Sequence, residues 1–349
     1  MSLIGRIPSL NKETMDEIYA RWDKKAKPLG SLGRLEDMVA VLGGIFQTVT
    51  PDPGKKAVIV MAGDNGVVEE GVAQSDYHVT TTVTCNMTHE DATVAILARL
   101  NGADVFPVDI GMYEDVDCPG VIPRKVCHGT ANMTKGPAMT REQAVEAVWT
   151  GIHMIMDLKK QGYGLFATGE MGIGNTTTSS AVASVLLDCP VEKVTGRGAG
   201  LSSQGLVRKI HAIKTAIAVN HPDPEDILDV ISKVGGLDIA GMMGCCIGAG
   251  AAQVPVVLDG FISSVAALAA VDLAPGCRPY LFPSHCSAEP AGKMVLDALG
   301  MKAYINAGMC LGEGTGAVTA FHLFDTALEA YYKIPEFEQA HIEAYTHLK

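Results

Sequence analysis

The chain has 349 residues, of which 48% are hydrophobic, only 5% are aromatic and 38 are glycine. This composition excludes extended disorder and predicts one large α/β domain with a core of small aliphatic side chains and many tight turns. The formal net charge of −12 argues against nucleic acid as a partner, although backbone N–H groups and one or two cations could still hold a single small anion.

The N-terminal segment, residues 1–50, predicts two helices. The first is expected over residues 11–26, where a plausible asparagine cap and an early acidic residue open the pattern. The connector KPLGSLGRLE, at 27–36, is interrupted by glycine and proline and leads into a second amphipathic helix. The turn sequence PDPG at 51–54 then marks a boundary.

After this boundary, short apolar runs end repeatedly in glycine with an acidic or small polar residue. Continuous apolar runs without alternation are typical of parallel strands covered on both faces. They lie at 56–64, 103–112, 163–175, 254–260, 278–284 and 303–313. Helical patterns separate them at 83–100, 141–160, 176–187, 202–220 and 288–299. This alternation predicts a doubly wound, mostly parallel α/β sheet, in which ligands bind beyond the carboxyl ends of the strands.

Helical sequence returns from about residue 317 to the C-terminus. We expect the two ends of the chain to pack together as a small helical domain of residues 1–50 plus about 318–349. Residues 51–317 would then form the large α/β catalytic domain.

The cysteines and the N-terminus favour a reduced, cytoplasmic protein. The nine cysteines have no repeating spacing, and the adjacent pair Cys245 and Cys246 lies in an apolar run, so free thiols are expected rather than a disulfide frame. No motif pairs with Cys127 and His128 at ligand spacing, so no metal is predicted. The N-terminus lacks an apolar signal core, and the run at 239–252 is too short to span a bilayer, so no membrane is expected either.

The sequence GEMGIGNTTTSS at 169–180 is the first stretch that predicts chemistry. A strand is expected to lead into it and a helix to leave it, and Gly174 allows close backbone approach. Asn175 or Thr176 could cap the helix, whose first N–H groups would then face an anion. The loop lacks the ending of a Walker A motif and fits the dinucleotide pattern G-x-G-x-x-G poorly. We interpret it as a phosphate cradle.

Two further loops carry polar groups toward the same edge. GRGAG at 196–200 precedes a helix with Arg208 and Lys209. Arg208 is interpreted as a solvated cation, whereas Lys209 could equally be solvated or lean toward a bound anion. SHCSAE at 284–289 follows a strand but has no nucleophile elbow, so Ser287 is interpreted as a hydrogen-bond donor near a helix start.

LGEGTGA, at 311–317, places Glu313 between two glycines. Its carboxylate would be unobstructed, and partial burial would raise its pKa toward neutrality, as suits a general base. Glu170 is a second carboxylate at a neighbouring strand end, and paired carboxylates are compatible with glycosyl chemistry through an oxocarbenium-like transition state. The residues alone therefore predict an enzyme with a phosphate cradle, an acid or base, and no metal.

These motifs, in this order, resemble the nicotinate-nucleotide:dimethylbenzimidazole phosphoribosyltransferases of cobamide lower-ligand synthesis. The likeness covers nearly the whole chain, and its anchors are KPLGSLGRLE (27–36), MAGDNGV (61–67), GEMGIGNTT (169–177), GRGAGL (196–201), LDGFISS (258–264), SHCSAEP (284–290) and LGEGTGA (311–317). It implies transfer of phosphoribose from nicotinate mononucleotide to an aromatic base or phenol, with inversion to an α-linked product and release of nicotinate. It also implies no cofactor and a dimer, either with itself or with a paralogue.

The resemblance also implies roles for individual residues. Glu313 matches the catalytic base, and Glu170 matches a second active-site glutamate. The ribose and phosphate are expected at Gly174, Asn175, Thr176, Gly198, Lys209, Gly260 and Ser287. The acceptor pocket is expected at Ser75, Thr82, Met171, Leu311 and Gly312.

The sequence departs from the family pattern mainly around the acceptor. Thr82 stands where the family commonly has a glutamine that lines the acceptor pocket. The other changed positions are Asn65, Glu90, Asp91, Ala291, Gly292 and Cys310. We therefore hypothesise that the acceptor differs from dimethylbenzimidazole, with a subunit of a heterodimeric phenol- or p-cresol-activating enzyme, weakly active or non-catalytic, as the alternative.

Two other classes of protein remain as competitors. A non-catalytic binding paralogue would be expected to lose the glutamate or the phosphate cradle, and neither is lost. A nicotinamide-dependent oxidoreductase needs G-x-G-x-x-G after its first strand, which MAGDNGV does not supply.

Overall fold

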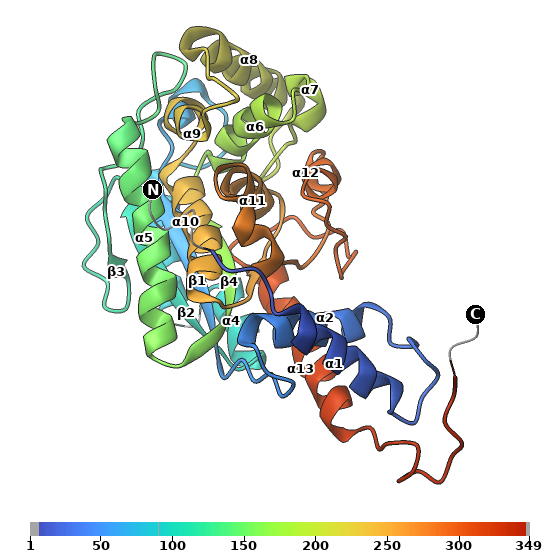
Figure 1. Ribbon diagram of the computed structural model, residues 1–349. Helices are drawn as coiled ribbons and strands as arrows, with labels where there is room; N and C mark the ends of the chain where they lie inside the picture. Colours follow the sequence, from blue (N-terminus) through green and yellow to red (C-terminus); the bar gives the residue numbers. More distant parts are fainter. Residues whose placement is uncertain (1–6, 90, 347–349) are drawn as a thin grey trace.

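A six-stranded parallel sheet forms the centre of the protein (Figure 1). The computed structural model describes residues 7–89 and 91–346. The strands follow the spatial order β3-β2-β1-β4-β5-β6, and each pairs in parallel with its neighbours. Their bounds are β1 (Lys55–Gly63), β2 (Ala103–Gly111), β3 (Ile122–Pro123), β4 (Tyr163–Met171), β5 (Val256–Leu258) and β6 (Leu281–Pro283). The prediction of a doubly wound parallel sheet is confirmed.

β1 is the central strand, and the order of strands reverses beside it. It pairs with β2 on one edge and with β4 on the other. Its residues 57–63 are all buried, which is why this strand shows a continuous apolar run instead of alternation. Because the chain leaves β1 and β4 in opposite directions, a crevice opens at their carboxyl ends, where ligands of such sheets bind.

Helices cover both faces of the sheet. They are α1 (Lys12–Asp23), α2 (Arg34–Phe46), α3 (Tyr77–Met87), α4 (Thr93–Leu100), α5 (Arg141–Lys160), α6 (Asn175–Leu186), α7 (Val191–Val194), α8 (Ser203–Asn220), α9 (Ile227–Val234), α10 (Leu237–Ala252), α11 (Phe261–Leu273), α12 (Gly292–Ala298) and α13 (Thr315–Lys333), with short 3-10 helices η2 (Gly66–Glu70) and η3 (Pro275–Tyr280). The helices α5, α10 and α11 pack on one face, and α4 and α13 pack on the opposite one. No helix in the described ranges combines the length and apolar character needed to cross a membrane.

Local signals set several helix starts. The Asn11 side chain accepts a hydrogen bond from Thr14 N at 3.1 Å and caps α1, as predicted. At α5, the side chains and backbone of Thr140 and Gln143 cap each other reciprocally in a capping box. Ser202 likewise caps α8 by accepting from Gly205 N at 3.1 Å.

Three of the predicted elements are wrong. Segment 303–313 is not a strand, because only Ile305 pairs with its neighbour, as an isolated bridge to His285. The predicted helix 83–100 is two helices, α3 and α4, with a turn between them. The first part of 278–284 belongs to η3, where Pro275 and Pro279 favour the tighter helix. The short strand β3 and the helices α7, α9, α10 and α11 were not predicted.

The backbones of α5 and α10 lie in direct contact, side by side in Figure 1. A Cβ atom added at Gly151 of α5 would overlap with the carbonyl oxygen of Gly241 and lie 2.7 Å from Cys245 N. A Cβ at Gly244 would overlap with the carbonyl oxygen of Val148. Glycine at these positions therefore allows α10 to lie close enough to be buried beneath α5.

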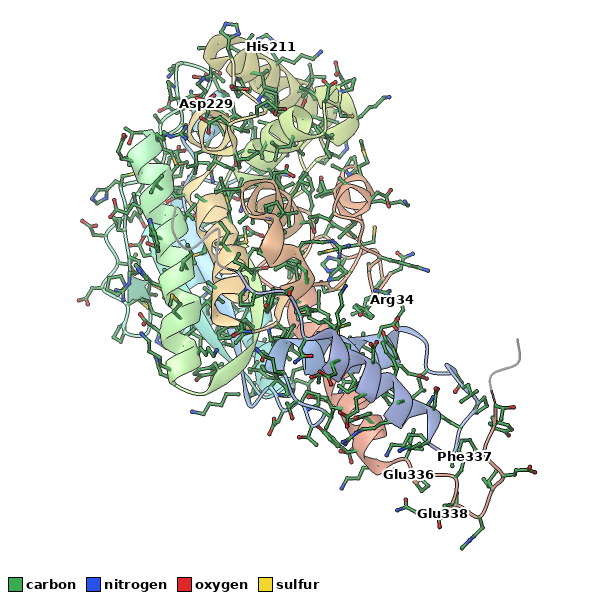
Figure 2. All side chains as sticks on the ribbon, viewed as in Figure 1. Arg34, His211, Asp229, Glu336, Phe337 and Glu338 are labelled. Carbon is green, nitrogen blue, oxygen red and sulfur yellow. The ribbon has the colours of Figure 1, made fainter. Side chains whose placement is uncertain are left out.

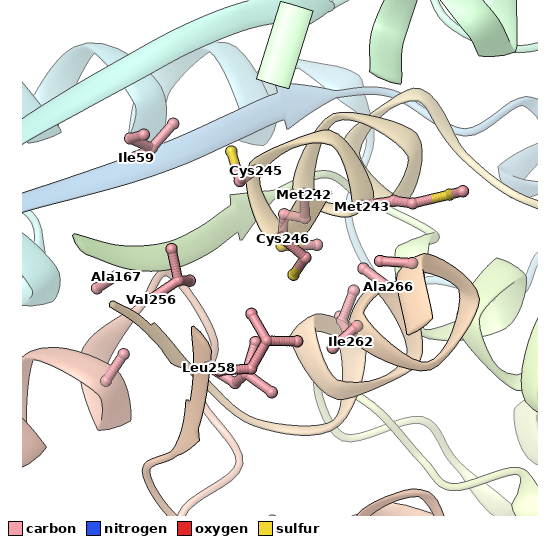
Figure 3. Packing of buried hydrophobic residues seen from close by; sticks show 14 of the residues in the cluster. Ile59, Ala167, Met242, Met243, Cys245, Cys246, Val256, Leu258, Ile262 and Ala266 are labelled. Carbon is pink, nitrogen blue, oxygen red and sulfur yellow. The ribbon is translucent and has the colours of Figure 1, made fainter. Parts of the chain in front are cut away.

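The core between α10 and the sheet consists mainly of small and sulfur-containing side chains. Figure 3 shows residues of α10 packed against the strands and α11: Ile59, Ala167, Met242, Met243, Cys245, Cys246, Val256, Leu258, Ile262 and Ala266. Burial raises the pKa of both adjacent thiols well above the usual range for cysteine. These cysteines act as small hydrophobic groups, consistent with their being free.

The two ends of the chain meet around the C-terminal part of α13. Trp22 packs edge-on against Tyr331 with ring centroids 5.0 Å apart, and Ala26 N donates to the Pro335 carbonyl at 2.8 Å. Figure 2 shows Glu336, Phe337 and Glu338 on the segment after α13, and Arg34 at the start of α2. Helix α13 runs without a break from the sheet into this helical group, so the predicted boundary near residue 318 falls inside it. The division into two domains remains a prediction.

We expect Gly151→Ala to lower the free energy of unfolding by about 1–3 kcal/mol or more, because its methyl group has no space between α5 and α10. Urea denaturation would measure the change. Gly136→Ala is the matched control, since a Cβ there meets nothing within 4 Å. Its effect should stay within about 0.5 kcal/mol. Equal stability of the two variants would contradict the close packing of these helices.

Candidate active site

A cavity of about 360 Å³ opens at the carboxyl ends of β4, β5 and β6. Its wall consists of segments that follow these strands, together with α3 and the loop before α13. The segments that follow β4, β5 and β6 and the end of 303–313 meet at this cavity, whereas residues 109–112 at the end of β2 and Asp64 after β1 do not line it. The lining residues that the sequence placed at the ribose and phosphate are Gly174, Asn175, Thr176, Gly198, Gly260 and Ser287.

Helix α6 begins beside the cavity without a side-chain cap. Gly174 occupies the capping position in the left-handed region, with φ of 92°. The expectation that Asn175 or Thr176 caps the helix is wrong, because both side chains face other partners. Asn175 Nδ2 donates to Glu170 Oε2, and Thr176 Oγ1 accepts from Lys209 Nζ at 2.8 Å. The start of the helix is left as backbone, as an anion cradle requires.

Lys209 is fully buried behind Thr176. A Cβ added at Gly198 would lie 2.7 Å from Thr176 Oγ1 and 3.4 Å from Lys209 Nζ, so the bare GRGAG loop lets the ammonium approach the cradle. Burial lowers the pKa of Lys209 to about 8, and the charge of Glu289 opposes this shift. Arg208, by contrast, donates to the Gly71 carbonyl at 3.2 Å from an exposed position. Its burial excludes the interpretation of Lys209 as a solvated cation, whereas its contact with a bound anion remains a prediction.

Glu313 lies in a strained turn between two glycines. Its φ of 62° is in the left-handed region, and Gly312 and Gly314 have φ of 96° and 94°. Glu313 Oε2 accepts a hydrogen bond from Val94 N, at the start of α4, at 3.3 Å. Partial burial raises the pKa of Glu313, the Val94 N–H opposes the shift, and the charge of Asp259 adds to it. The carboxylate lines the cavity, and its raised pKa makes it a stronger base than an exposed glutamate.

Glu170 lies against the same turn but is buried. A Cβ at Gly312 would overlap with Glu170 Oε1, so only glycine allows these two segments to approach. Burial, followed by the charges of Asp238 and Asp259, raises the pKa of Glu170 well above its usual range. The two glutamates are therefore different: Glu170 favours the neutral acid, and the less buried Glu313 ionises more readily.

Asp259, at the end of β5, is the residue that sequence reasoning missed. Its buried carboxylate accepts hydrogen bonds from the backbone N–H groups of Gly314 (3.1 Å), Gly316 (2.8 Å) and Ala317 (3.2 Å). Helix α13 has no side-chain cap of its own, so Asp259 caps it across more than fifty residues of chain. An acid before glycine at a strand end, as in LDG, was the signal that could have identified it.

Helix α3 forms the apolar wall of the cavity. The Thr80 hydroxyl donates to Asp64 Oδ1 at 2.5 Å and accepts from Ile173 N at 3.2 Å, which ties α3 to the loops after β1 and β4. Val79 and Val83, one helical turn apart, thereby line the cavity. The prediction for Thr82 is corrected, because Thr82 is exposed on another side of α3 and is not part of the lining.

The other predicted acceptor residues do line the cavity: Ser75, Met171, Leu311 and Gly312. Among the departures from the family pattern, Cys310 is also in the wall, whereas Asn65 is buried beneath it and Glu90 lies outside the described residues. Within residues 7–89 and 91–346, no three His, Cys, Asp or Glu side chains are arranged to hold a metal ion.

Known proteins are similar to this chain in both sequence and fold. The family model DBI_PRT, described as Phosphoribosyltransferase, matches residues 7–342. The nicotinate-nucleotide–dimethylbenzimidazole phosphoribosyltransferase of Acetivibrio thermocellus is 52% identical over 97% of both chains. The protein of the same name from Ruminiclostridium cellulolyticum is 50% identical over 99% of this chain and 98% of its own. The crystal structure of CobT from Thermus thermophilus has a TM-score of 0.91 at 37% identity, covering 95% of this chain and 100% of that one.

We expect Asp259→Asn to lower the free energy of unfolding by about 1–3 kcal/mol, because an amide cannot accept from all three N–H groups at the start of α13. Urea denaturation measures this effect. Asp117→Asn, in an exposed loop, makes the same chemical change and should stay within about 0.5 kcal/mol. If Asp259→Asn left the free energy of unfolding unchanged, the cap would contribute little to stability.

Proposed function

The chain belongs to the phosphoribosyltransferase family DBI_PRT, and from this membership we propose that it transfers phosphoribose from nicotinate mononucleotide to dimethylbenzimidazole in cobamide synthesis. It is thus a nicotinate-nucleotide-dependent pentosyltransferase. The observation that carries the proposal is that the Glu313 carboxylate and the cradle around Thr176 line one cavity. A base and a phosphate site on one wall can hold both reacting molecules together.

The phosphate of nicotinate mononucleotide binds at the start of α6. Backbone N–H groups after Gly174 supply the partial positive charge of the helix end. The Lys209 ammonium, held by Thr176 behind the cradle, supplies the full charge. A net charge of −12 does not oppose this binding, because the cation is local and buried.

Glu313 acts as the general base. It takes the N–H proton of the benzimidazole while the ring's other nitrogen attacks C1′ of the ribose. The bond between C1′ and the nicotinate nitrogen breaks, and its electron pair returns to the pyridinium ring, so nicotinate leaves without needing a proton. Attack on the opposite face gives the α-linked riboside phosphate.

Glu170 supports this step by staying neutral. Two ionised carboxylates beside one substrate would repel each other and hold both pKa values high. The deep burial of Glu170 favours its protonated form, which leaves Glu313 as the ionised member of the pair. The acid beside the ribose then acts as a hydrogen-bonding group.

The acceptor binds against the apolar wall of Val79, Val83 and Met171. The relatives are named for dimethylbenzimidazole, which does not favour the hypothesis of a phenol-activating subunit. Thr82, a main motive for that hypothesis, lies outside the cavity lining. A non-catalytic paralogue is equally disfavoured, because Glu313 and the loop before α6 are both kept and line the cavity. Dimerisation and a cytoplasmic location remain predictions from the family resemblance.

The function is tested by incubating the purified chain with nicotinate mononucleotide and dimethylbenzimidazole, with phenols in parallel, and measuring nicotinate release and the riboside phosphate. Glu313→Gln should lower kcat by about 10²–10⁴-fold, because the amide cannot take the proton. Nucleotide binding by calorimetry should not change. In the unsubstituted enzyme, kcat/KM should fall at acid pH as Glu313 becomes protonated. Because burial raises the pKa of Glu313 from its ordinary value of 4.5, this fall should be centred at a pH above 4.5.

The control is Glu225→Gln on an exposed loop, which should keep full activity. Near-normal turnover by Glu313→Gln would remove Glu313 as the base. Failure of the unsubstituted chain with every acceptor would refute the proposed function itself.

The affinity for nicotinate mononucleotide should fall as pH rises through about 8, because Lys209 loses its proton near this pH in the enzyme without bound nucleotide. The loss should approach tenfold per pH unit, while kcat at saturation changes little because bound phosphate holds the ammonium protonated. Lys209→Met should raise KM and remove this limb of the pH profile. Lys214→Met, on an exposed part of the same helix, should keep both. An unchanged limb in Lys209→Met would show that another group titrates.

A further inference from the structure

One carboxylate in the cavity wall has no part in the steps above. Glu289 lies in the turn after β6 and lines the cavity. Its Oε2 atom is buried, and within the described residues this atom has no hydrogen-bond partner. Because Oε2 lies against Gly196, a ligand in the cavity can reach only the other carboxylate oxygen, Oε1, which accepts no hydrogen bond within the described residues either. A carboxylate that lines a cavity without a donor favours a ligand that supplies one.

The backbone of Glu289 is held by the turn around it, and its side chain occupies a space left by a glycine. Glu289 N donates to Ser287 Oγ at 3.2 Å, and Gly292 N donates to the Glu289 carbonyl at 2.9 Å. A Cβ at Gly196 would overlap with Glu289 Oε2 and lie 2.7 Å from Pro290 Cδ. The first glycine of the GRGAG loop thus leaves the space that the carboxylate occupies. Glu289 is positioned before any substrate arrives.

Its neighbours place Glu289 in the part of the cavity that takes the ribose phosphate. Ser287, two residues earlier, lines the same wall, and Gly198 follows Gly196 in the GRGAG loop. The charge of Glu289 is also felt by Lys209, behind the cradle. The carboxylate therefore lies near the phosphate site, yet it cannot bind phosphate, because two anions repel each other.

The chemistry of the substrate limits what Glu289 can accept from. The phosphate and the nicotinate carboxylate of nicotinate mononucleotide are hydrogen-bond acceptors. The N–H group of the benzimidazole donates to Glu313 in the proposed mechanism. The remaining donors are the ribose hydroxyls. A hydrogen bond from a hydroxyl to an ionised carboxylate is among the stronger kinds, and contacts to the sugar hydroxyls strengthen as positive charge develops on the ring.

We propose that Glu289 accepts a hydrogen bond from a ribose hydroxyl of nicotinate mononucleotide and so selects ribose over deoxyribose donors. This inference rests on the proposed function. Both the 2′ and the 3′ hydroxyl have the required chemistry, and the experiment distinguishes them.

The test compares kcat/KM for nicotinate mononucleotide with its 2′-deoxy and 3′-deoxy analogues. The unsubstituted enzyme should discriminate against one analogue on the order of 100-fold, because the missing hydroxyl leaves Glu289 unpaired. Glu289→Ala should lower kcat/KM for the ribose substrate by a similar factor but leave that for the same analogue nearly unchanged. The ratio of kcat/KM for the ribose substrate to kcat/KM for that analogue then falls toward one. The analogue that shows this fall identifies the hydroxyl that Glu289 contacts.

Glu289→Gln keeps an acceptor oxygen and should give an intermediate ratio. Glu225→Ala, on the exposed loop, is the matched control and should keep the ratio of the unsubstituted enzyme. Undiminished discrimination by Glu289→Ala at both positions would overturn the proposal, as would equal use of all three donors by the unsubstituted enzyme. If Glu289→Ala does not fold, Glu289→Gln decides: a reduced ratio supports the proposal, and an unchanged ratio overturns it.

Calorimetry separates this proposal from the function on which it rests. Binding of the three nucleotides without an acceptor should show the same dependence on Glu289, even if turnover is absent. Binding that discriminates, with no transfer to any base, would refute the proposed function alone. Transfer without discrimination would refute the role of Glu289 alone.

Discussion

The Asp259 carboxylate, at the end of β5, accepts hydrogen bonds from three backbone N–H groups at the start of α13. This interaction joins the sheet to the helix that carries Glu313 just before its first turn. It holds Gly314 in place and with it the left-handed backbone of Glu313, which would not persist without support from its surroundings. The position of Glu313, the proposed base, thus depends on the carboxylate of Asp259.

Different degrees of burial give the charged groups of the site different tasks. Glu170 is buried and favours the neutral form, whereas Glu313 is partly exposed and receives one backbone N–H. Lys209 is buried, so its charge interacts strongly with nearby groups. Burial also lowers its pKa to about 8, so the protonation of its amine changes with pH in this range. Burial therefore gives the two glutamates of the cavity wall and the lysine behind Thr176 different preferences for the charged form.

Close approach of another segment of the chain requires glycine at several positions. Gly151 and Gly244 allow α5 and α10 to touch, and Gly312 allows the turn that contains Glu313 to lie against Glu170. Gly198 opens the loop in front of Lys209. Each glycine was visible in the sequence, but the group that approaches it comes from a distant segment, so its purpose could not be read from local pattern.

The sequence by itself determined the parallel sheet, the bounds of α5 and the family, because hydrophobic periodicity, caps and ordered motifs are local properties of the chain. It also predicted Glu313 as an unobstructed carboxylate at a ligand site, and the structure places Glu313 in the cavity wall. Only the tertiary structure decided that Lys209 is buried, that α3 presents Val83 and not Thr82, and that segment 303–313 is a loop. The burial of Lys209, the side of α3 that lines the cavity and the cap from Asp259 all depend on residues far away in sequence. These interactions form only once the chain has folded.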